Sequence, residues 1–293
     1  MRARRSAAAL SILLVLVAAP PGRAQEPDTA PPRPRESGYA RIGDLRMYYE
    51  VYGRGRPLLL LHGGGGGIRN FAGQIREFAR DRLVIAPEQM GQGRTPDLPR
   101  PLGYLDMAEA TAELLRRLHV ERADVVGWSD GGILGLILAV RHPALVRRLA
   151  VSGANVRPGR EAITPAMLDR LRRYRPEEDS AGRAEYAALS PDSARHYAII
   201  MRKLLDLWLT HPTPAELTLS ELGRIAAPTL VMAGDRDVIR LEETVAIFRA
   251  IPGAELFIVP GTGHATFRER PEWVNPILRA FFDGGRAPPK RAR

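Results

Sequence analysis

The chain has 293 residues, 45% of them hydrophobic, which suffices for one substantial core and a smaller accessory module. The formal net charge is +10, but eight of these charges lie in the end segments 1–24 and 284–293. Nucleic-acid binding needs a basic face on the folded body, and the small remaining charge argues against it. The chain contains no cysteine, which excludes disulfides and lipidation at a cysteine.

The first segment predicts export. A basic start precedes an apolar run over residues 7–19 that is too short to span a bilayer comfortably. Small residues at Gly22 and Ala24 suit a signal peptidase. We therefore expect residues 1–24 to be a signal peptide cleaved after Ala24, and the protein to be secreted or periplasmic without stable membrane insertion. An uncleaved N-terminal anchor is the alternative.

Residues 25–37 are polar and proline-rich and predict a disordered linker, and residues 284–293 predict a disordered tail. Between them, short apolar runs alternate with helical patterns. The predicted strands are Leu58–Leu61, Leu83–Ala86, Asp124–Gly127, Leu149–Ser152, Thr229–Ala233 and Glu255–Val259. The predicted helices include Phe71–Asp81, Tyr104–Leu118 and Ile133–Arg141. Strands that are apolar throughout, without alternating polar residues, and that are separated by helices predict an α/β fold with a mostly parallel, doubly wound sheet.

Two further features complete the predicted architecture. Tyr39–Ile42 and Leu45–Tyr52 flank a Gly-Asp turn and predict an antiparallel hairpin on the sheet edge. Between residues 156 and 227 the strand pattern stops, and helix-start signals occur at Thr164, Ser190 and Thr213, each followed by proline. We expect residues 156–227 to form a helical cap inserted into a core made of residues 38–155 and 228–283.

The segment Gly127–Gly132 reads Gly-Trp-Ser-Asp-Gly-Gly and lies between a predicted strand and a predicted helix. A strand-turn-helix context of this kind suits the Gly-x-Ser-x-Gly elbow, whose glycines allow a turn too tight for side chains. Ser129 would then be presented at a helix N-terminus as a nucleophile. The alternative is a serine that only caps the helix.

A second glycine-rich segment, His62–Gly67, follows the strand Leu58–Leu61. Its backbone N–H groups are unscreened by side chains and could bind an oxyanion. A flexible loop and a phosphate cradle are the alternatives. The phosphate reading lacks the Gly-Lys-Ser/Thr ending and the Gly-x-Gly-x-x-Gly opening that nucleotide sites use.

Acidic and histidine residues follow the two late strands. Asp235 and Asp237 come after the strand Thr229–Ala233, and His264 lies in a glycine-rich loop after Glu255–Val259. The carboxyl ends of parallel strands converge, so these side chains can meet Ser129 in one crevice. Five other histidines compete, but none follows a late strand in a glycine-rich loop: His62, His119, His142, His196 and His211.

These motifs identify the chain as similar to the α/β-hydrolase fold superfamily over about residues 38–283. The block from Gly127 to Asn155 resembles the valacyclovir-hydrolase (biphenyl-hydrolase-like) group of serine esterases. The superfamily pattern selects Asp237 over Asp235 as the acid. One departure is visible at Glu88–Gly93, where such enzymes often have Asp-x-Arg-Gly-x-Gly, and it puts local loop contacts in doubt.

The resemblance implies a serine esterase with a Ser129, His264 and Asp237 triad, and the predicted signal peptide makes it a secreted one. The N–H groups of Gly64 and Asp130 would form the oxyanion hole. In the group that the chain resembles, the acid after the nucleophile can also bind a substrate amine. The Asp130 side chain would then bind α-amino acid esters, or else serve only the helix N-terminus.

We expect a small-molecule ester as the substrate, with no cofactor, no metal ion and no nucleic acid. The same triad could instead cleave a carbon-carbon bond or make peracids. A non-catalytic protein that binds ligands with this fold is the alternative from another class. The acyl and alcohol groups of the substrate and the oligomeric state stay open.

Overall fold

The computed structural model describes residues 31–213 and 215–284. Its centre is an eight-stranded sheet in the order β1-β2-β4-β3-β5-β6-β7-β8. The first three strands in this order pair antiparallel, and those from β4 to β8 run parallel, which confirms the predicted α/β fold class. The strands are β1 (Glu36–Ile42), β2 (Leu45–Tyr52), β3 (Arg56–Leu61), β4 (Arg82–Pro87), β5 (Ala123–Trp128), β6 (Val146–Ser152), β7 (Thr229–Gly234) and β8 (Glu255–Val259).

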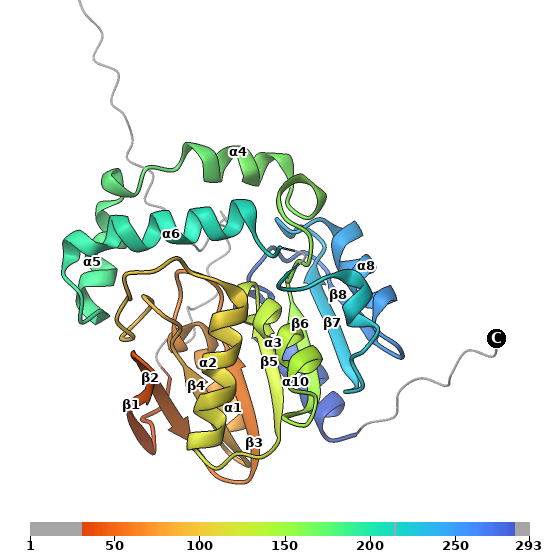
Figure 1. Cartoon of the computed structure of the whole chain (residues 1–293). Coiled ribbons are helices and arrows are strands. Elements are labelled where there is room, and N and C mark those ends of the chain that lie inside the picture. The colour runs from red at the N-terminus through yellow and green to blue at the C-terminus, as the bar shows by residue number, and fades with distance from the viewer. Residues whose placement is uncertain (1–30, 214, 285–293) are drawn as a thin grey trace, which may run out of the picture.

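Helices cover both faces of the sheet (Figure 1). The α-helices are α1 (Ala72–Phe78), α2 (Tyr104–Arg117), α3 (Asp130–Arg141), α4 (Pro165–Arg173), α5 (Ser180–Leu189), α6 (Tyr197–Thr210), α7 (Leu219–Leu222), α8 (Leu241–Ala250), α9 (Thr266–Glu269) and α10 (Pro271–Phe282). Short 3₁₀ helices are η1 (Ile68–Phe71), η2 (Gly159–Glu161), η3 (Pro176–Glu178) and η4 (Ala194–His196).

The continuous apolar strands bury side chains on both faces of the sheet. In β3, Leu58 and Leu60 pack into the cluster that contains residues of α1 and α10. Leu59 and Leu61 point the other way, into the cluster that contains residues of α2 and α3. Because successive side chains of a strand alternate between faces, a strand covered on both sides is apolar at every position.

Three helices between β6 and β7, α4 to α6, form a cap that lies beyond one end of the strands, at the top of Figure 1. Helix α4 begins after Thr164, as predicted. The helix starts predicted at Ser190 and Thr213 are wrong, because η4 begins after Ser193 and α7 after Thr218. Near Thr213, the Glu216 carboxylate accepts the Thr213 N–H and also reaches the Tyr104 N–H, so it holds a turn against α2 instead of starting a helix.

The segment boundaries at the ends differ slightly from expectation. Strand β1 begins at Glu36, which pairs with Val51. The linker predicted over residues 25–37 therefore extends too far into this strand. Gly284 belongs to the turn after α10, where its N–H donates to the Phe281 carbonyl. The predicted signal peptide lies outside the described residues. Within 31–213 and 215–284, every helix is too short or too polar to cross a bilayer.

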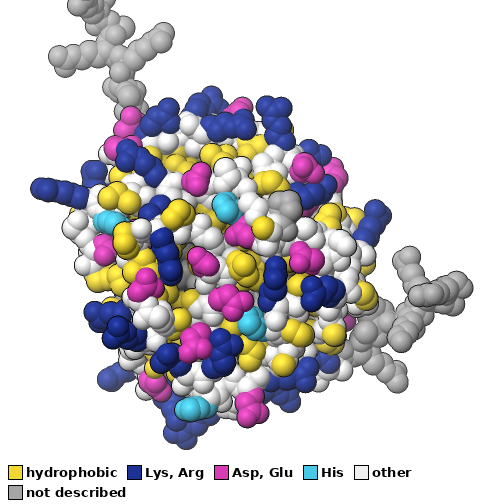
Figure 2. Space-filling model, in the orientation of Figure 1, with side chains coloured by type: hydrophobic (Ala, Val, Ile, Leu, Met, Phe, Trp, Pro, Cys, Tyr) yellow, Lys and Arg dark blue, Asp and Glu magenta, His cyan; other side chains and the backbone are white. Residues whose placement is uncertain are grey.

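On the face seen in Figure 2, lysine and arginine side chains are interspersed with acidic and apolar ones and form no continuous patch. The strongest grouping of charge is instead buried, at the starting ends of β4 and β5. Asp124 Oδ2 accepts from Arg82 Nη1 at 2.7 Å and from Arg147 Nη2 at 2.6 Å, and the Asp124 side chain is fully buried. Asp283 contacts Arg82 as well. The cluster thereby joins three strands to the end of α10.

Removing Asp124 should destabilise the fold strongly. Asp124→Ala leaves two guanidinium groups without their shared carboxylate, and breaking a buried pair costs about 3–5 kcal/mol. The free energy of unfolding, measured by urea denaturation, should fall by this amount. The control is Asp81→Ala, which breaks the half-exposed pair between Asp81 and Arg279 and should cost no more than about 1 kcal/mol. Equal losses in the two variants would contradict the assignment.

Candidate active site

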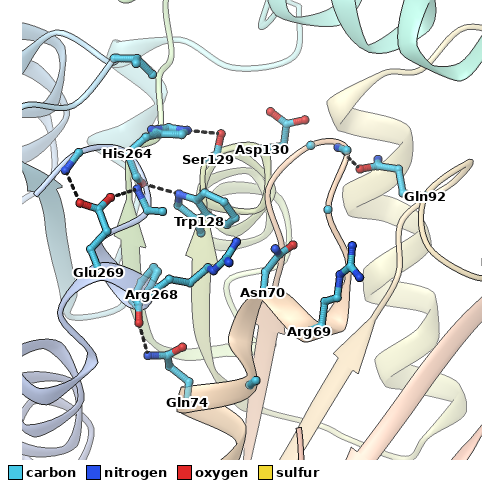
Figure 3. A pocket seen from close by; sticks show the side chains of 18 of the residues that line it. Arg69, Asn70, Gln74, Gln92, Trp128, Ser129, Asp130, His264, Arg268 and Glu269 are labelled. Carbon is cyan, nitrogen blue, oxygen red and sulfur yellow. Dashed lines mark hydrogen bonds between the residues drawn. The ribbon is translucent and has the colours of Figure 1, made fainter. Parts of the chain in front are cut away.

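Ser129 lies in a strained turn between β5 and α3. Its φ of 55° and ψ of −121° place a non-glycine residue in the left-handed region, where L-residues are rarely found. Conformations of this kind cost about 1–3 kcal/mol and persist only where the surroundings impose them. The turn directs the side chain out of the sheet at the N-terminus of α3, between His264 and Asp130 (Figure 3).

The surroundings that impose this turn are two glycines. A Cβ added at Gly131 would lie 2.0 Å from the Leu61 carbonyl oxygen, and one at Gly127 would lie 2.2 Å from the Gly131 carbonyl oxygen. Both obstacles are backbone atoms of the sheet or of the turn, so they cannot move aside as a flexible side chain could. The close approach of β3, β5 and α3 therefore requires glycine at both positions.

His264 connects Ser129 to Asp237. Its Nε2 lies 2.9 Å from Ser129 Oγ, and its Nδ1 lies 2.7 Å from Asp237 Oδ1. Asp235, the other acid of that loop, is exposed and is not the partner of His264. Gly153 leaves room for the pair, since a Cβ there would lie 2.8 Å from the imidazole. Loops after β5, β7 and β8 thus bring Ser129, Asp237 and His264 together.

The surroundings of His264 favour its protonated form. Burial, the largest single influence, would lower the pKa of the imidazole, but the charge and hydrogen bond of Asp237 act in the opposite direction. The carboxylates of Asp130 and Glu269 add to this effect, so the pKa of His264 lies above its ordinary value. An imidazole held in this way readily accepts a proton from a neighbouring hydroxyl.

The glycine loop after β3 lies beside the same turn. The N–H groups of Gly65, Gly66 and Gly67 are engaged by Gln92 Oε1, the Gly63 carbonyl and Asn70 Oδ1. Gly64 precedes them and lines the pocket with Asp130. The Asp130 N–H is the first of α3 and has no acceptor within the helix. The structure therefore brings both predicted oxyanion donors, Gly64 and Asp130, to the pocket that holds Ser129.

The side chain of Asp130 is buried with neutral partners. The Tyr104 hydroxyl donates to Oδ1 at 3.0 Å, and Trp208 Nε1 donates to Oδ2 at 3.0 Å. Burial raises the pKa of this carboxyl although both hydrogen bonds lower it. Sequence analysis missed Tyr104 and Trp208, because each lies far from Asp130 along the chain and neither belongs to a motif.

A cavity of about 1700 Å³ joins these groups to the cap. Ser129, Asp130 and His264 line one part of it. Apolar side chains of the cap and its flanking segments line another part: Ile163, Met167, Leu171, Ile200, Met201 and Leu204. Charged side chains such as Arg69, Glu77 and Arg279 line the remainder. The part between Ser129 and the cap, with apolar walls beside a few polar groups, is of the kind typical of small-molecule sites.

The loop after β4 departs from the superfamily pattern but is firmly held. Arg94 replaces the missing arginine: its N–H and its Nη1 donate to the buried Glu88 carboxylate at 2.6 and 3.1 Å. Met90, at the usual arginine position, is buried in the core. Gln92 of the same loop accepts the Gly65 N–H at 2.7 Å. The loop after β4 is therefore held by the ion pair between Arg94 and Glu88, although it lacks the arginine of the superfamily pattern.

The other five histidines are engaged elsewhere. His62 accepts the Gln89 N–H at 3.1 Å, and burial lowers its pKa to about 4, so it is neutral. His142, His196 and His211 contact Glu109, Asp97 and Glu216. His119 lies in the turn after α2 and has a φ of 54°. None of these contacts includes Ser129.

The chain is similar in sequence to known hydrolases. The chain is 30% identical to mouse Serine hydrolase BPHL over 125 residues, which are 41% of this chain and 43% of the mouse protein. It is 29% identical to 2-hydroxymuconate semialdehyde hydrolase of Pseudomonas sp. (strain CF600) over 244 residues, covering 76% of this chain and 85% of that protein. These similarities confirm the predicted resemblance to biphenyl-hydrolase-like enzymes.

The fold has solved counterparts. The structure of 2-hydroxy-6-oxo-6-phenylhexa-2,4-dienoate hydrolase from Rhodococcus sp. strain RHA1 superposes with a TM-score of 0.70 at 22% identity, covering 85% of this chain and 98% of that one. The family model described as "Alpha/beta hydrolase family" matches residues 58–277. Since this match spans most of the sequence, the chain belongs to the alpha/beta hydrolase family.

Proposed function

We propose that this hydrolase is a serine enzyme that cleaves carboxylic esters through an acyl-enzyme. The observation that carries the proposal is the continuous hydrogen-bonded path from Ser129 Oγ through His264 to Asp237. The strained turn at Ser129 supports it, because strain of this kind is kept where a function requires it. The cavity beside Ser129 has room for a small organic substrate.

In the proposed reaction, His264 Nε2 takes the proton of Ser129 Oγ as the oxygen attacks the ester carbonyl. Asp237 keeps the Nδ1 proton on the imidazole and stabilises the imidazolium. The N–H groups of Gly64 and Asp130 stabilise the oxyanion, and His264 then protonates the departing alcohol. Water, activated by the same imidazole, hydrolyses the acyl-enzyme and releases the acid.

Loss of the nucleophile should abolish turnover. Ser129→Ala should lower kcat/KM for a 4-nitrophenyl ester by roughly 10⁴-fold or more, because triad members act as a unit. A fluorophosphonate probe should label the wild type and not this variant. Ser220→Ala, on the exposed surface of α7, is the control and should keep full activity. Hydrolysis by Ser129→Ala at the wild-type rate would disprove the proposed mechanism.

The enzyme should lose activity on acidification at a higher pH than an ordinary histidine would predict. His264 accepts a proton only when it is neutral, and its pKa is raised, so the neutral form is lost as the pH falls through that raised value. The acid limb of kcat/KM should therefore have its midpoint above about pH 6.5, the ordinary histidine value. Initial rates between about pH 5 and 9 measure it. A midpoint well below the ordinary value would contradict the assignment of His264 as the base.

We further propose that the ester carries an α-amino group, bound by Asp130. The carboxylate is buried, and Tyr104 and Trp208, which donate hydrogen bonds to it, are both neutral. An ionised carboxylate can accept about four hydrogen bonds, so it retains capacity for an ammonium group. Apolar cap residues beside it would receive the rest of the acyl chain.

The test compares an aminoacyl ester with its des-amino analogue. The wild type should prefer the amine by about 10- to 100-fold in kcat/KM, the value of a hydrogen bond to a charged group. Asp130→Asn should remove most of this preference while it retains the backbone N–H and the hydrolysis of the neutral ester. If the wild type has no preference for the amine, Asp130 does not bind it.

One relative favours a second candidate reaction. The Pseudomonas protein that matches most of this chain is named as a 2-hydroxymuconate semialdehyde hydrolase, an enzyme that acts on a different substrate class. The same triad could serve carbon-carbon bond hydrolysis here. Turnover of such a semialdehyde, with none of any ester, would favour this alternative.

We also propose that the protein acts outside the cytoplasm. The support is the basic and apolar segment before Ala24, which resembles a cleavable export signal.

A further inference from the structure

The backbone on both sides of His264 is held by one carboxylate. Glu269, the last residue of the short helix α9, accepts the Gly263 N–H through Oε2 at 2.8 Å and the Ala265 N–H through Oε1 at 3.1 Å (Figure 3). These two donors are the backbone N–H groups of the residues on either side of His264 in the chain. A carboxylate that accepts from both fixes the orientation of the residue between them.

The carbonyl of His264 is held separately, from the side of the nucleophile. Trp128 Nε1 donates to the His264 carbonyl oxygen at 2.6 Å, and the two rings lie with their centroids 5.6 Å apart. Trp128 is the last residue of β5, directly before Ser129, and is 5% exposed. The position of the base is thereby tied to the strand that presents the nucleophile.

The loop that carries His264 needs this support. It contains Gly261, with a φ of 68°, and Gly263. Glycine is compatible with many backbone conformations, so the loop could adopt others. The imidazole must nevertheless reach both Ser129 and Asp237 at hydrogen-bonding distance. A misplacement of about 1 Å at such a site can lower the rate by about 10²-fold.

We propose that Glu269 and Trp128 are positioning residues, which hold His264 in line between Ser129 and Asp237. The proposal rests on the proposed acyl transfer, in which His264 is the base. Glu269 has a second effect through its charge. The acidic groups that act on the imidazole are Asp237 after β7, Asp130 of α3 and Glu269 of α9, while Arg236 and Arg268 line the same cavity.

The first variant is Glu269→Gln. Each carboxylate oxygen accepts one of the two N–H groups, so the amide oxygen would keep one donor while the amide NH₂ group would face the other. For a neutral 4-nitrophenyl ester, kcat should fall by about 10- to 100-fold with KM within about twofold of the wild type. The acid limb of the pH profile should also move to lower pH, because one negative charge near the imidazolium is lost.

The second variant is Trp128→Phe, which keeps an aromatic ring but removes the donor to the His264 carbonyl. Its kcat should fall in the same range, about 10- to 100-fold, while the acid limb stays in place because no charge changes. The matched controls are Glu242→Gln and Trp273→Phe, both at exposed positions that do not line the cavity, and both should retain wild-type kcat.

Wild-type kcat in either Trp128→Phe or a folded Glu269→Gln overturns the proposal for that residue. Thermal melting reports whether each variant folds, and if Glu269→Gln does not, Glu269→Asp, whose shorter side chain cannot span both donors, replaces it. If the wild type hydrolyses no ester, the proposed function fails. NMR of the His264 imidazole then tests positioning alone. The resonance of the Nδ1 proton reports the hydrogen bond to Asp237, and an unchanged resonance in Trp128→Phe and Glu269→Gln overturns the proposal.

Discussion

The turn between β5 and α3 leaves no free space around the backbone. The Cα of Gly131 approaches the end of β3 so closely that even a methyl group would collide with the Leu61 carbonyl. This contact fixes where α3 starts relative to the sheet. It also determines the direction of Ser129, the position of the Asp130 N–H and the distance to the glycine loop after β3. The groups that surround the cavity therefore depend on one contact between backbones.

Sequence patterns predicted the parts of the site that follow from this geometry. Ser129, Asp237 and His264 each lie in the loop that follows a strand, and parallel strands bring their carboxyl ends to one edge. Contacts made by single side chains over long distances were not predictable. Trp208 reaches Asp130 across 78 residues, and only the rotation of α6 about its own axis decides whether it does so.

In the segment after the cap, too, a local sequence pattern failed to predict the structure. Thr213 precedes proline and a glutamate three positions on, a pattern typical of a helix start. In the structure the Glu216 carboxylate also accepts the N–H of Tyr104, 112 residues away, and the chain forms a turn instead. The hydrogen bond from Tyr104 stabilises the turn. This tertiary contact outweighs the local preference for a helix start at Thr213.

The contact between Gly64 and Asp130 also constrains how the protein can diverge. A Cβ at Gly64 would lie 2.2 Å from Asp130 Oδ2 and 2.8 Å from the Trp208 ring, so the glycine provides the space that the acid and the indole occupy. A larger residue at 64 would be tolerated only with a smaller one at 130 or a displaced α6. Positions 64, 130 and 208 should therefore change together among homologues, and an exchange of substrate preference would require coordinated substitutions in the loop, the elbow and the cap.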